Sequence, residues 1–162
     1  MLNGVFYDCG KVKNMATLPE LRASPINTLR ETVLIDLPND VELQEMVEKA
    51  NDIWKSADGS FGQKIQLLAT FVSDSLGGPL EHGRWNGYKA DLSRLKKLEG
   101  TNVLPLGKIK LGTYYHRSLL FKVVCDSLSI LCSLNRGSFP IYWNAVTEFK
   151  DTDTLVRIVC RN

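Results

Sequence analysis

The stretch that decides the fold of this chain is Leu104-Pro-Leu-Gly-Lys-Ile-Lys-Leu-Gly-Thr-Tyr-Tyr-His-Arg-Ser-Leu-Leu-Phe-Lys122. Gly112 ends an extended approach, and a helix over 113–128 is expected to begin directly after it. Beyond Ser129, the run Ile130–Arg136 predicts a strand closed by Gly137. Apolar residues recur through the predicted helix at the three-to-four spacing of a buried face: Leu119, Leu120, Val123, Val124 and Leu128.

Three further helices are predicted upstream of this stretch. The first covers 40–55, with Asn39 as the expected capping residue and Glu42 reaching back. The second begins at a capping box formed by Ser60 and Gln63 and ends at Gly77-Gly78-Pro79. The third covers 88–99, after an exposed loop over 79–87 that holds Trp85. Apolar side chains form one stripe on each helix: Leu43, Met46, Val47, Ala50 and Trp54, then Ile65, Leu68, Ala69, Val72 and Leu76, then Tyr88, Leu92 and Leu95.

Strands are predicted over 33–37, 142–149 and 155–160, with a turn at 150–153 before the last one. Helices followed by an antiparallel meander indicate an α+β domain in which a helical layer packs on the sheet. We expect one domain over 1–162, with a loop-rich arm at 1–30, a mainly helical part at 31–100, and the central helix and strands at 101–162.

Composition and charge exclude several classes of function. The chain has 162 residues, 44% of them apolar and 23% charged, with a formal net charge of +2. That charge is too small to argue for nucleic acid or an anionic membrane as a partner, and no apolar run reaches membrane-spanning length. The start of the chain lacks the pattern of a signal peptide, so we expect a cytoplasmic protein. Six basic residues are expected to form a solvated face: Lys89, Arg94, Lys96, Lys97, Lys108 and Lys110.

Cysteine usage also indicates a cytoplasmic protein. The four cysteines are widely separated and have no C-x-x-C spacing, so they are expected to act as small buried hydrophobic residues in a reducing cytosol. His82 and His116 are not placed to complete a zinc site with them. We expect no metal and no cofactor. The four are Cys9, Cys125, Cys132 and Cys160.

Several blocks together resemble a known family. They are Val33–Leu37, Asp52-Ile-Trp-Lys-Ser56, Phe71-Val-Ser-Asp-Ser-Leu-Gly-Gly78, and above all the opening stretch with its His116-Arg-Ser-Leu-Leu-Phe-Lys122. This combination is similar to the peptidase-like domain of plant Raf-type kinases of the ethylene-response and disease-resistance group. Armadillo repeat-containing protein three of animals carries the same domain. The resemblance covers residues 4–160 and is closer to the armadillo type. The chain stops as its last predicted strand ends, so we expect a fragment or short isoform, and the resemblance implies that the longer protein is an armadillo-repeat protein.

The resemblance implies a transglutaminase-like, papain-like fold with an ancestral Cys-His-Asp site, and each position of that site departs from the enzyme pattern here. Plant members carry cysteine two residues before the His-Arg pair, where this chain has Tyr114. The base is expected at the start of the strand after Gly137, but no histidine follows His116. The orienting carboxylate is expected in the last strand, where this chain has Arg157.

Rebuilt catalysis is not expected from the remaining groups. Tyr114 and His116 are two residues apart on a helix, so their side chains do not face each other. Cys125 lies three turns into the helix and Cys132 within an apolar strand. We therefore expect a catalytically degenerate domain that acts in protein–protein interaction or regulation through a partner the sequence does not name. A residual cysteine protease or acyl-transferase of the transglutaminase-like class is the alternative.

The degenerate cleft can be interpreted as a binding surface, because aromatic and arginine side chains are enriched at interaction hot spots. The same side chains could instead fill the cleft and stabilise the core, and both interpretations stay open. His116 and Arg117 are expected to join the start of the helix to the preceding loop by hydrogen bonds. The candidate binding residues are Tyr114, Tyr115, His116, Arg117, Trp143, Asn144 and Arg157.

Overall fold

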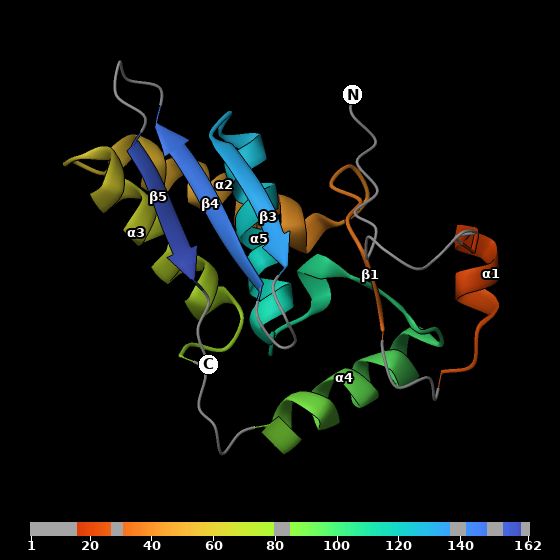
Figure 1. Cartoon of the computed structure of the whole chain (residues 1–162). Helices are drawn as coiled ribbons and strands as arrows, with labels where there is room; N and C mark the ends of the chain where they lie inside the picture. Colours follow the sequence, from red (N-terminus) through yellow and green to blue (C-terminus); the bar gives the residue numbers. More distant parts are fainter. Residues whose placement is uncertain (1–15, 27–30, 80–84, 137–141, 149–153, 160–162) are drawn as a thin grey trace.

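The structure, a computed structural model, describes residues 16–26, 31–79, 85–136, 142–148 and 154–159 (Figure 1). The helices are α1 (Leu18–Ala23), α2 (Val41–Ser56), α3 (Phe61–Ser75), α4 (Trp85–Glu99) and α5 (Tyr114–Ser127), with a 3-10 turn, η2, at Leu106–Lys108. The strands are β1 (Thr32–Leu34), β2 (Val103–Pro105), β3 (Leu131–Arg136), β4 (Tyr142–Glu148) and β5 (Thr154–Val159).

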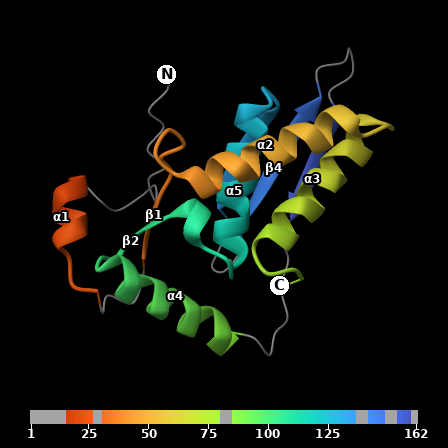
Figure 2. The ribbon, with the colours of Figure 1, turned by 180° about the vertical axis from the view of Figure 1, so that it is seen from behind.

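Helix α5 is the centre of the fold. It contacts β3 and β4 on one side and α2 and α3 on the other, so it lies between the helical layer and the sheet (Figures 1 and 2). Strands β3, β4 and β5 form an antiparallel sheet in that order. The expected α+β arrangement of a helical layer on an antiparallel sheet is therefore confirmed. Four apolar α5 residues are almost fully buried: Leu120, Phe121, Val124 and Cys125.

The predicted helices are present, with corrections at their starts. Asp40, not Asn39, caps α2, because its carboxylate accepts the Leu43 N–H at 3.1 Å. The Asn39 side chain instead donates to the Asp36 carboxylate at 3.0 Å. Helix α4 begins at Trp85, three residues earlier than expected, which shortens the predicted loop.

The predicted helix ends are confirmed where a local signal specifies them. The Ser60 amide donates to Gln63 at 2.8 Å and completes the capping box of α3. Gly77 and Gly78 both adopt positive φ after α3, and the Gly78 N–H returns to the Ser73 carbonyl at 2.9 Å. This is the left-handed helix stop for which glycine is favoured.

Three elements of the described residues were not predicted: α1, β2 and the 3-10 turn η2. The arm at 1–30 contains α1, which begins at Leu18 after the capping residue Thr17, whose N–H donates to the Glu20 carboxylate at 2.7 Å. The extended approach to Gly112 contains β2, which pairs in parallel with β1 in the register Thr32↔Val103. The sheet arrangement of the domain therefore includes a small parallel pair as well as the antiparallel meander.

One close backbone contact holds the segment Leu104-Pro-Leu-Gly107 against α2. The Asp40 carboxylate accepts the Gly107 N–H at 2.9 Å while also capping α2. A Cβ atom at Gly107 would lie 2.3 Å from the Asp40 Oδ1 atom and 2.4 Å from the Leu43 nitrogen. Only glycine fits this contact without a shift of backbone.

The apolar stripes read from the sequence form the core. Leu43, Leu68, Leu76 and Leu104 are fully buried and belong to a cluster that also contains α4 and α5 side chains. In the sheet, Val146 is fully buried opposite Cys132. No helix among the described residues is long and apolar enough to cross a membrane.

The basic residues do not form one open face. Lys96 is buried, and its ammonium lies 3.8 Å from the Glu31 carboxylate. Exposed Arg94 contacts Asp91 at 2.6 Å. Lys108 contacts Glu99 at 2.9 Å, and this carboxylate raises the pKa of the lysine. The expected solvated face is wrong for Lys96, because its side chain turns into the domain toward a buried carboxylate.

Candidate functional site

The first turn of α5 holds four of the seven predicted site residues. Tyr114, at the position of the expected nucleophile, is buried, with 6% of its surface exposed. Its ring meets the partly buried Tyr115 ring edge-on, with centroids 5.9 Å apart. Tyr115 in turn lies against the His116 ring at a centroid distance of 3.8 Å. The aromatic side chains therefore pack on one another at the start of the helix.

His116 is fully buried and forms part of the helix cap. Its Nδ1 atom accepts the Thr113 N–H at 3.1 Å, the role that Glu or Gln has in an ordinary capping box. A backbone N–H can only donate, so Nδ1 carries the lone pair and the ring proton is assigned to Nε2. Nε2 lies 3.2 Å from the Glu31 carboxylate.

Glu31 connects three elements through its carboxylate. It lies directly before β1 and faces Lys96 of α4 and His116 of α5. Burial by itself would raise the pKa of Glu31, but His116 and Lys96 stabilise the charged form, and the net pKa is lowered. The Glu31 side chain is only 5% exposed, so this is an interior charge cluster.

Arg117 joins α5 to the end of α3. Its guanidinium donates to the Gly112 carbonyl and the Leu76 carbonyl, both at 2.9 Å. It also reaches the Ser73 Oγ atom at 2.8 Å and the Ser73 carbonyl at 3.3 Å. The Ser73 and Leu76 carbonyls lie at the C-terminal end of α3, where a positive charge is favoured. The hydrogen bonds expected between the His116-Arg117 pair and the preceding loop are present, and Arg117 extends them to α3.

Gly112 makes this junction possible. Its N–H donates to the Leu76 carbonyl at 3.1 Å. A Cβ atom at Gly112 would lie 2.9 Å from the Leu76 Cδ1 atom and 3.1 Å from the His116 Cβ atom. The Gly-x-x-x-His-Arg spacing therefore brings the α3 end and the α5 start into direct contact.

The remaining predicted site residues lie on the sheet. Asn144 of β4 pairs with Leu134 and Ile158, Trp143 pairs with Asn135 and Val159, and Arg157 lies opposite Ala145. The β3-to-β4 end of the sheet lies at the same end of the domain as the α5 start (Figure 1). The side chains of Trp143, Asn144 and Arg157 lie outside the described part of the structure, so their role in binding stays a prediction.

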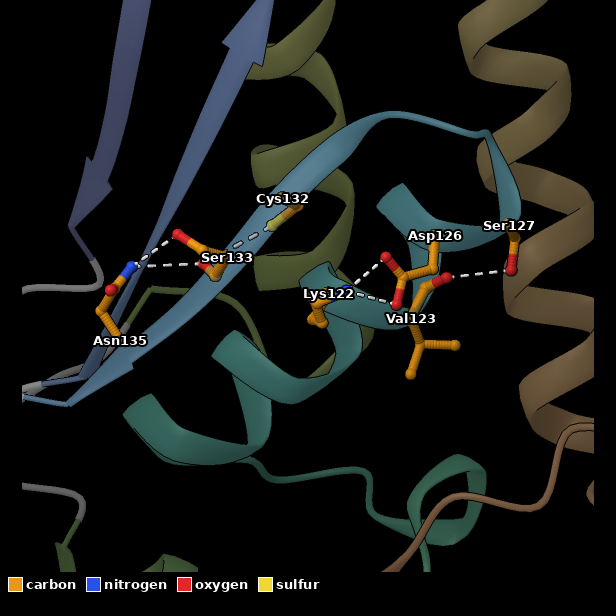
Figure 3. A network of polar contacts seen from close by, with 7 residues as sticks. All are labelled: Lys122, Val123, Asp126, Ser127, Cys132, Ser133 and Asn135. Atoms are coloured by element: carbon orange, nitrogen blue, oxygen red, sulfur yellow. Dashed lines mark hydrogen bonds and ion pairs between the residues drawn. The ribbon is translucent and has the colours of Figure 1, made fainter. Parts of the chain in front are cut away.

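The described thiols are remote from the α5 start. Cys125 is fully buried near the C-terminal end of α5, and Cys132 is partly exposed on β3. The hydrogen bond to Cys132 and burial both raise the pKa of Cys125. Figure 3 shows Cys132 on β3 beside an exposed group of polar contacts, in which Lys122 pairs with Asp126 and Asn135 donates to Ser133. In the described ranges, no three His, Cys, Asp or Glu side chains are grouped to hold a metal ion.

Sequence reasoning missed two members of the buried cluster. Lys96 follows the α4 stripe of Tyr88, Leu92 and Leu95 at helical spacing, and a charge on a buried stripe requires a partner. That signal was available. Glu31 carried no local signal, because its partners come from α4 and α5.

Comparison with known proteins places the domain. The family model described as EDR1/CTR1/ARMC3, peptidase-like, matches residues 2–154. Human armadillo repeat-containing protein 3 is 38% identical over 56% of this chain and 11% of its own length. From Arabidopsis thaliana, the probable serine/threonine-protein kinase SIS8 is 32% identical over 82% of this chain and 14% of the kinase. The serine/threonine-protein kinase CTR1 is 24% identical over 81% of this chain and 16% of the kinase.

No solved structure matches the chain. The regions matched in these three relatives amount to between 11% and 16% of their lengths. The Gly112-x-x-x-His116-Arg117 segment, whose contacts join α3, α5 and β1, lies inside the matched range. The chain belongs to the EDR1/CTR1/ARMC3 peptidase-like family.

Proposed function

We propose that this chain is a catalytically inactive peptidase-like domain that acts in protein–protein interaction or regulation in the cytoplasm. The observation that carries this proposal is the use of His116 and Arg117 as structural connectors at the start of α5. The Nδ1 lone pair of His116 is taken by the Thr113 amide, and the Arg117 guanidinium is taken by carbonyls and Ser73.

A cysteine hydrolase needs a thiolate and a base that can exchange a proton with it. The first turn of α5 contains Tyr114 instead. A free phenol has a pKa of about 10, so tyrosine is a far poorer anion than a cysteine thiolate near neutral pH. His116 could take up a proton at Nδ1 only by giving up the Thr113 amide, which would break the helix cap. Cys125 is buried with a raised pKa. These features weigh against a residual cysteine protease or acyl-transferase.

We further propose that the domain is a degenerate member of the transglutaminase-like, papain-like fold. The support is the order of elements, in which α5 is followed by the antiparallel strands β3, β4 and β5 packed against it. In that fold the nucleophile would stand at Tyr114, and the base would stand near the beginning of β4, which is at the same end of the domain (Figure 1).

The interaction site that we propose lies at this end, around Tyr115, Trp143, Asn144 and Arg157. Tyr114, His116 and Arg117 are buried and would support that surface from below. The matched relatives are a protein with armadillo repeats and two kinases, each several times longer than this chain. A protein partner, within the same polypeptide or on another one, is therefore the proposed ligand.

Turnover distinguishes the two classes of function. The purified domain is assayed for peptide hydrolysis and for acyl transfer from a glutamine or thioester substrate to an amine. We expect no rate above that of the heat-denatured protein. Turnover that disappears in Cys125→Ser or Cys132→Ser, with the fold intact by circular dichroism, would establish the enzyme and overturn the proposal.

Crosslinking tests the interaction site. A photoreactive amino acid is placed at position 115 and, as a control, at position 98, whose leucine is 74% exposed on α4. We expect a discrete protein adduct from position 115 that an excess of unlabelled domain competes away. Equal adducts from both positions, insensitive to the competitor, would contradict a specific surface at the α5 start.

A further inference from the structure

Two cysteines on neighbouring elements lie side by side behind the α5–β3 turn. Cys125 is on the last turn of α5 and Cys132 is the second residue of β3. The Ile130 N–H donates to the Cys125 carbonyl at 2.8 Å and folds the chain back on itself. Cys125 belongs to the apolar core, and Cys132 packs against the same core opposite Val146.

The two thiols have different surroundings. Cys132 is partly exposed, and its thiol donates to the Ser133 carbonyl at 3.8 Å. Cys125 is fully buried in the core cluster against which Cys132 packs. Burial and the neighbouring Cys132 both raise the pKa of Cys125. Because Cys132 is the partly exposed thiol of the two, it is the sulfur that a small reagent reaches first, and Cys125 lies behind it in the core.

We propose that Cys125 and Cys132 form a peroxide-responsive dithiol, with Cys132 as the attacking thiol and Cys125 as the resolving thiol. In the first step the Cys132 sulfur attacks a hydroperoxide, the O–O bond breaks, and sulfenic acid and an alcohol or water form. In the second step the Cys125 sulfur attacks the sulfenic sulfur. An S–S bond replaces the S–O bond, and the hydroxyl leaves with the Cys125 proton as water.

The two reaction steps balance in electrons, because the two thiols lose two electrons and the peroxide gains them. A small cellular thiol such as glutathione can reduce the resulting disulfide by thiol–disulfide exchange at the partly exposed Cys132 sulfur. The bridge would close the short turn over 126–131 and tie the end of α5 to β3, two elements already in contact.

The test uses the whole chain carrying Cys9→Ser and Cys160→Ser, which leaves only the proposed pair. The protein is exposed to hydrogen peroxide, unfolded, alkylated and weighed by intact mass spectrometry. We expect both thiols to be lost together, both to return after reduction, and a peptide crosslinked between 125 and 132. Wild-type protein mapped in parallel should show the same crosslinked peptide.

Single variants separate the two roles. With Cys125→Ala, peroxide should leave Cys132 as a sulfenic acid that dimedone traps, because no thiol remains to resolve it. With Cys132→Ala, Cys125 should stay reduced in the folded protein and become alkylated only after unfolding. Phenylarsine oxide, which needs two adjacent thiols, should protect the pair from alkylation and protect neither single variant.

Three results would overturn the proposal. They are oxidation of Cys132 to sulfinic acid without a bridge in the two-cysteine protein, alkylation of Cys125 as fast as Cys132 in the folded state, and no arsenical protection. Hydrolytic turnover is not part of these measurements, so their outcome is independent of the proposed loss of catalysis.

Discussion

Arg117 shows how one buried cation can hold two helices together. It is 5% exposed and donates to carbonyls of Gly112, Ser73 and Leu76. Its planar fork satisfies several acceptors at once, which a lysine ammonium on a single stem does not reproduce. The residue that resembles a site residue in sequence is, in its contacts, the connector between α3 and α5.

Arg117→Lys should therefore destabilise the domain by about 2–4 kcal/mol, because the lysine cannot replace all the guanidinium hydrogen bonds while the charge stays inside. Urea unfolding followed by circular dichroism measures the change. Arg94→Lys is the matched control, since Arg94 is 74% exposed and its pair with Asp91 lies on the surface; there we expect a change within about 0.5 kcal/mol. Similar effects at both positions would contradict the connector role.

Gly107 gives a second prediction at this scale. Gly107→Ala introduces a Cβ atom 2.3 Å from Asp40 and 2.4 Å from the Leu43 nitrogen. The overlap should cost about 1–3 kcal/mol of unfolding free energy, because the α2 cap must shift. Gly62→Ala, on α3 with nothing within 4 Å of the added atom, should instead be neutral or stabilising by up to about 1 kcal/mol. Thermal unfolding of both variants decides the comparison.

At the scale of elements, the buried Glu31 carboxylate links the start of β1 to α4 and α5. Its lowered pKa means that the unfolded chain takes up its proton at higher pH than the folded chain does. The contribution of Glu31 to stability is therefore complete above the ordinary carboxyl pKa of 4.5. It is lost as the pH falls through the lower value of the folded state.

Glu31→Gln should lower the free energy of unfolding by about 3 kcal/mol near pH 7, because Lys96 is left without its carboxylate. The difference between variant and wild type should shrink as the pH falls below 4.5. Urea unfolding across that range gives the measurement. Glu99→Gln, at the more exposed pair with Lys108, should cost at most about 1 kcal/mol. A Glu31 effect that does not vary with pH would contradict the ion cluster.

Elements differ in how far the sequence predicts them. The helices were predictable because their stripes and caps are local, as at Ser60 and Gln63. Strand β2 was not, because three residues carry no usable period and its partner β1 lies about 70 residues away. Asn39 and Asp40 are both good capping residues, and the choice between them depends on the Gly107 amide from a distant segment. Long-range pairing is the common cause of these misses.

The candidate site likewise divides into local features, which the sequence predicts, and long-range contacts, which it does not. The sequence placed Tyr114 through Arg117 in the first turn of α5, which the structure confirms. It did not place Glu31 against His116 or Ser73 against Arg117, because both contacts join segments that are distant in sequence. The burial of His116 and Arg117 was also not predictable, because a polar first turn is typical of an exposed helix start.

At the scale of the whole molecule, the arrangement around α5 predicts where the fold is most stable. Leu120 and Val124 are fully buried between the sheet and the other helices, whereas α1 contains no buried residue. Hydrogen exchange should show the slowest amides in the middle of α5, opening only with global unfolding, and fast exchange throughout α1. Faster exchange in α5 than in α3 would contradict its central position.

The double use of the Asp40 carboxylate has a practical consequence for anyone who divides this polypeptide. The same side chain begins α2 and holds an amide 67 residues further along the chain. A piece that starts at 40 and stops short of 107 would keep the acidic group but lose one of its two donors. Expression boundaries chosen inside that interval should yield poorly folded material, and two such pieces produced together should regain order only when they reassociate.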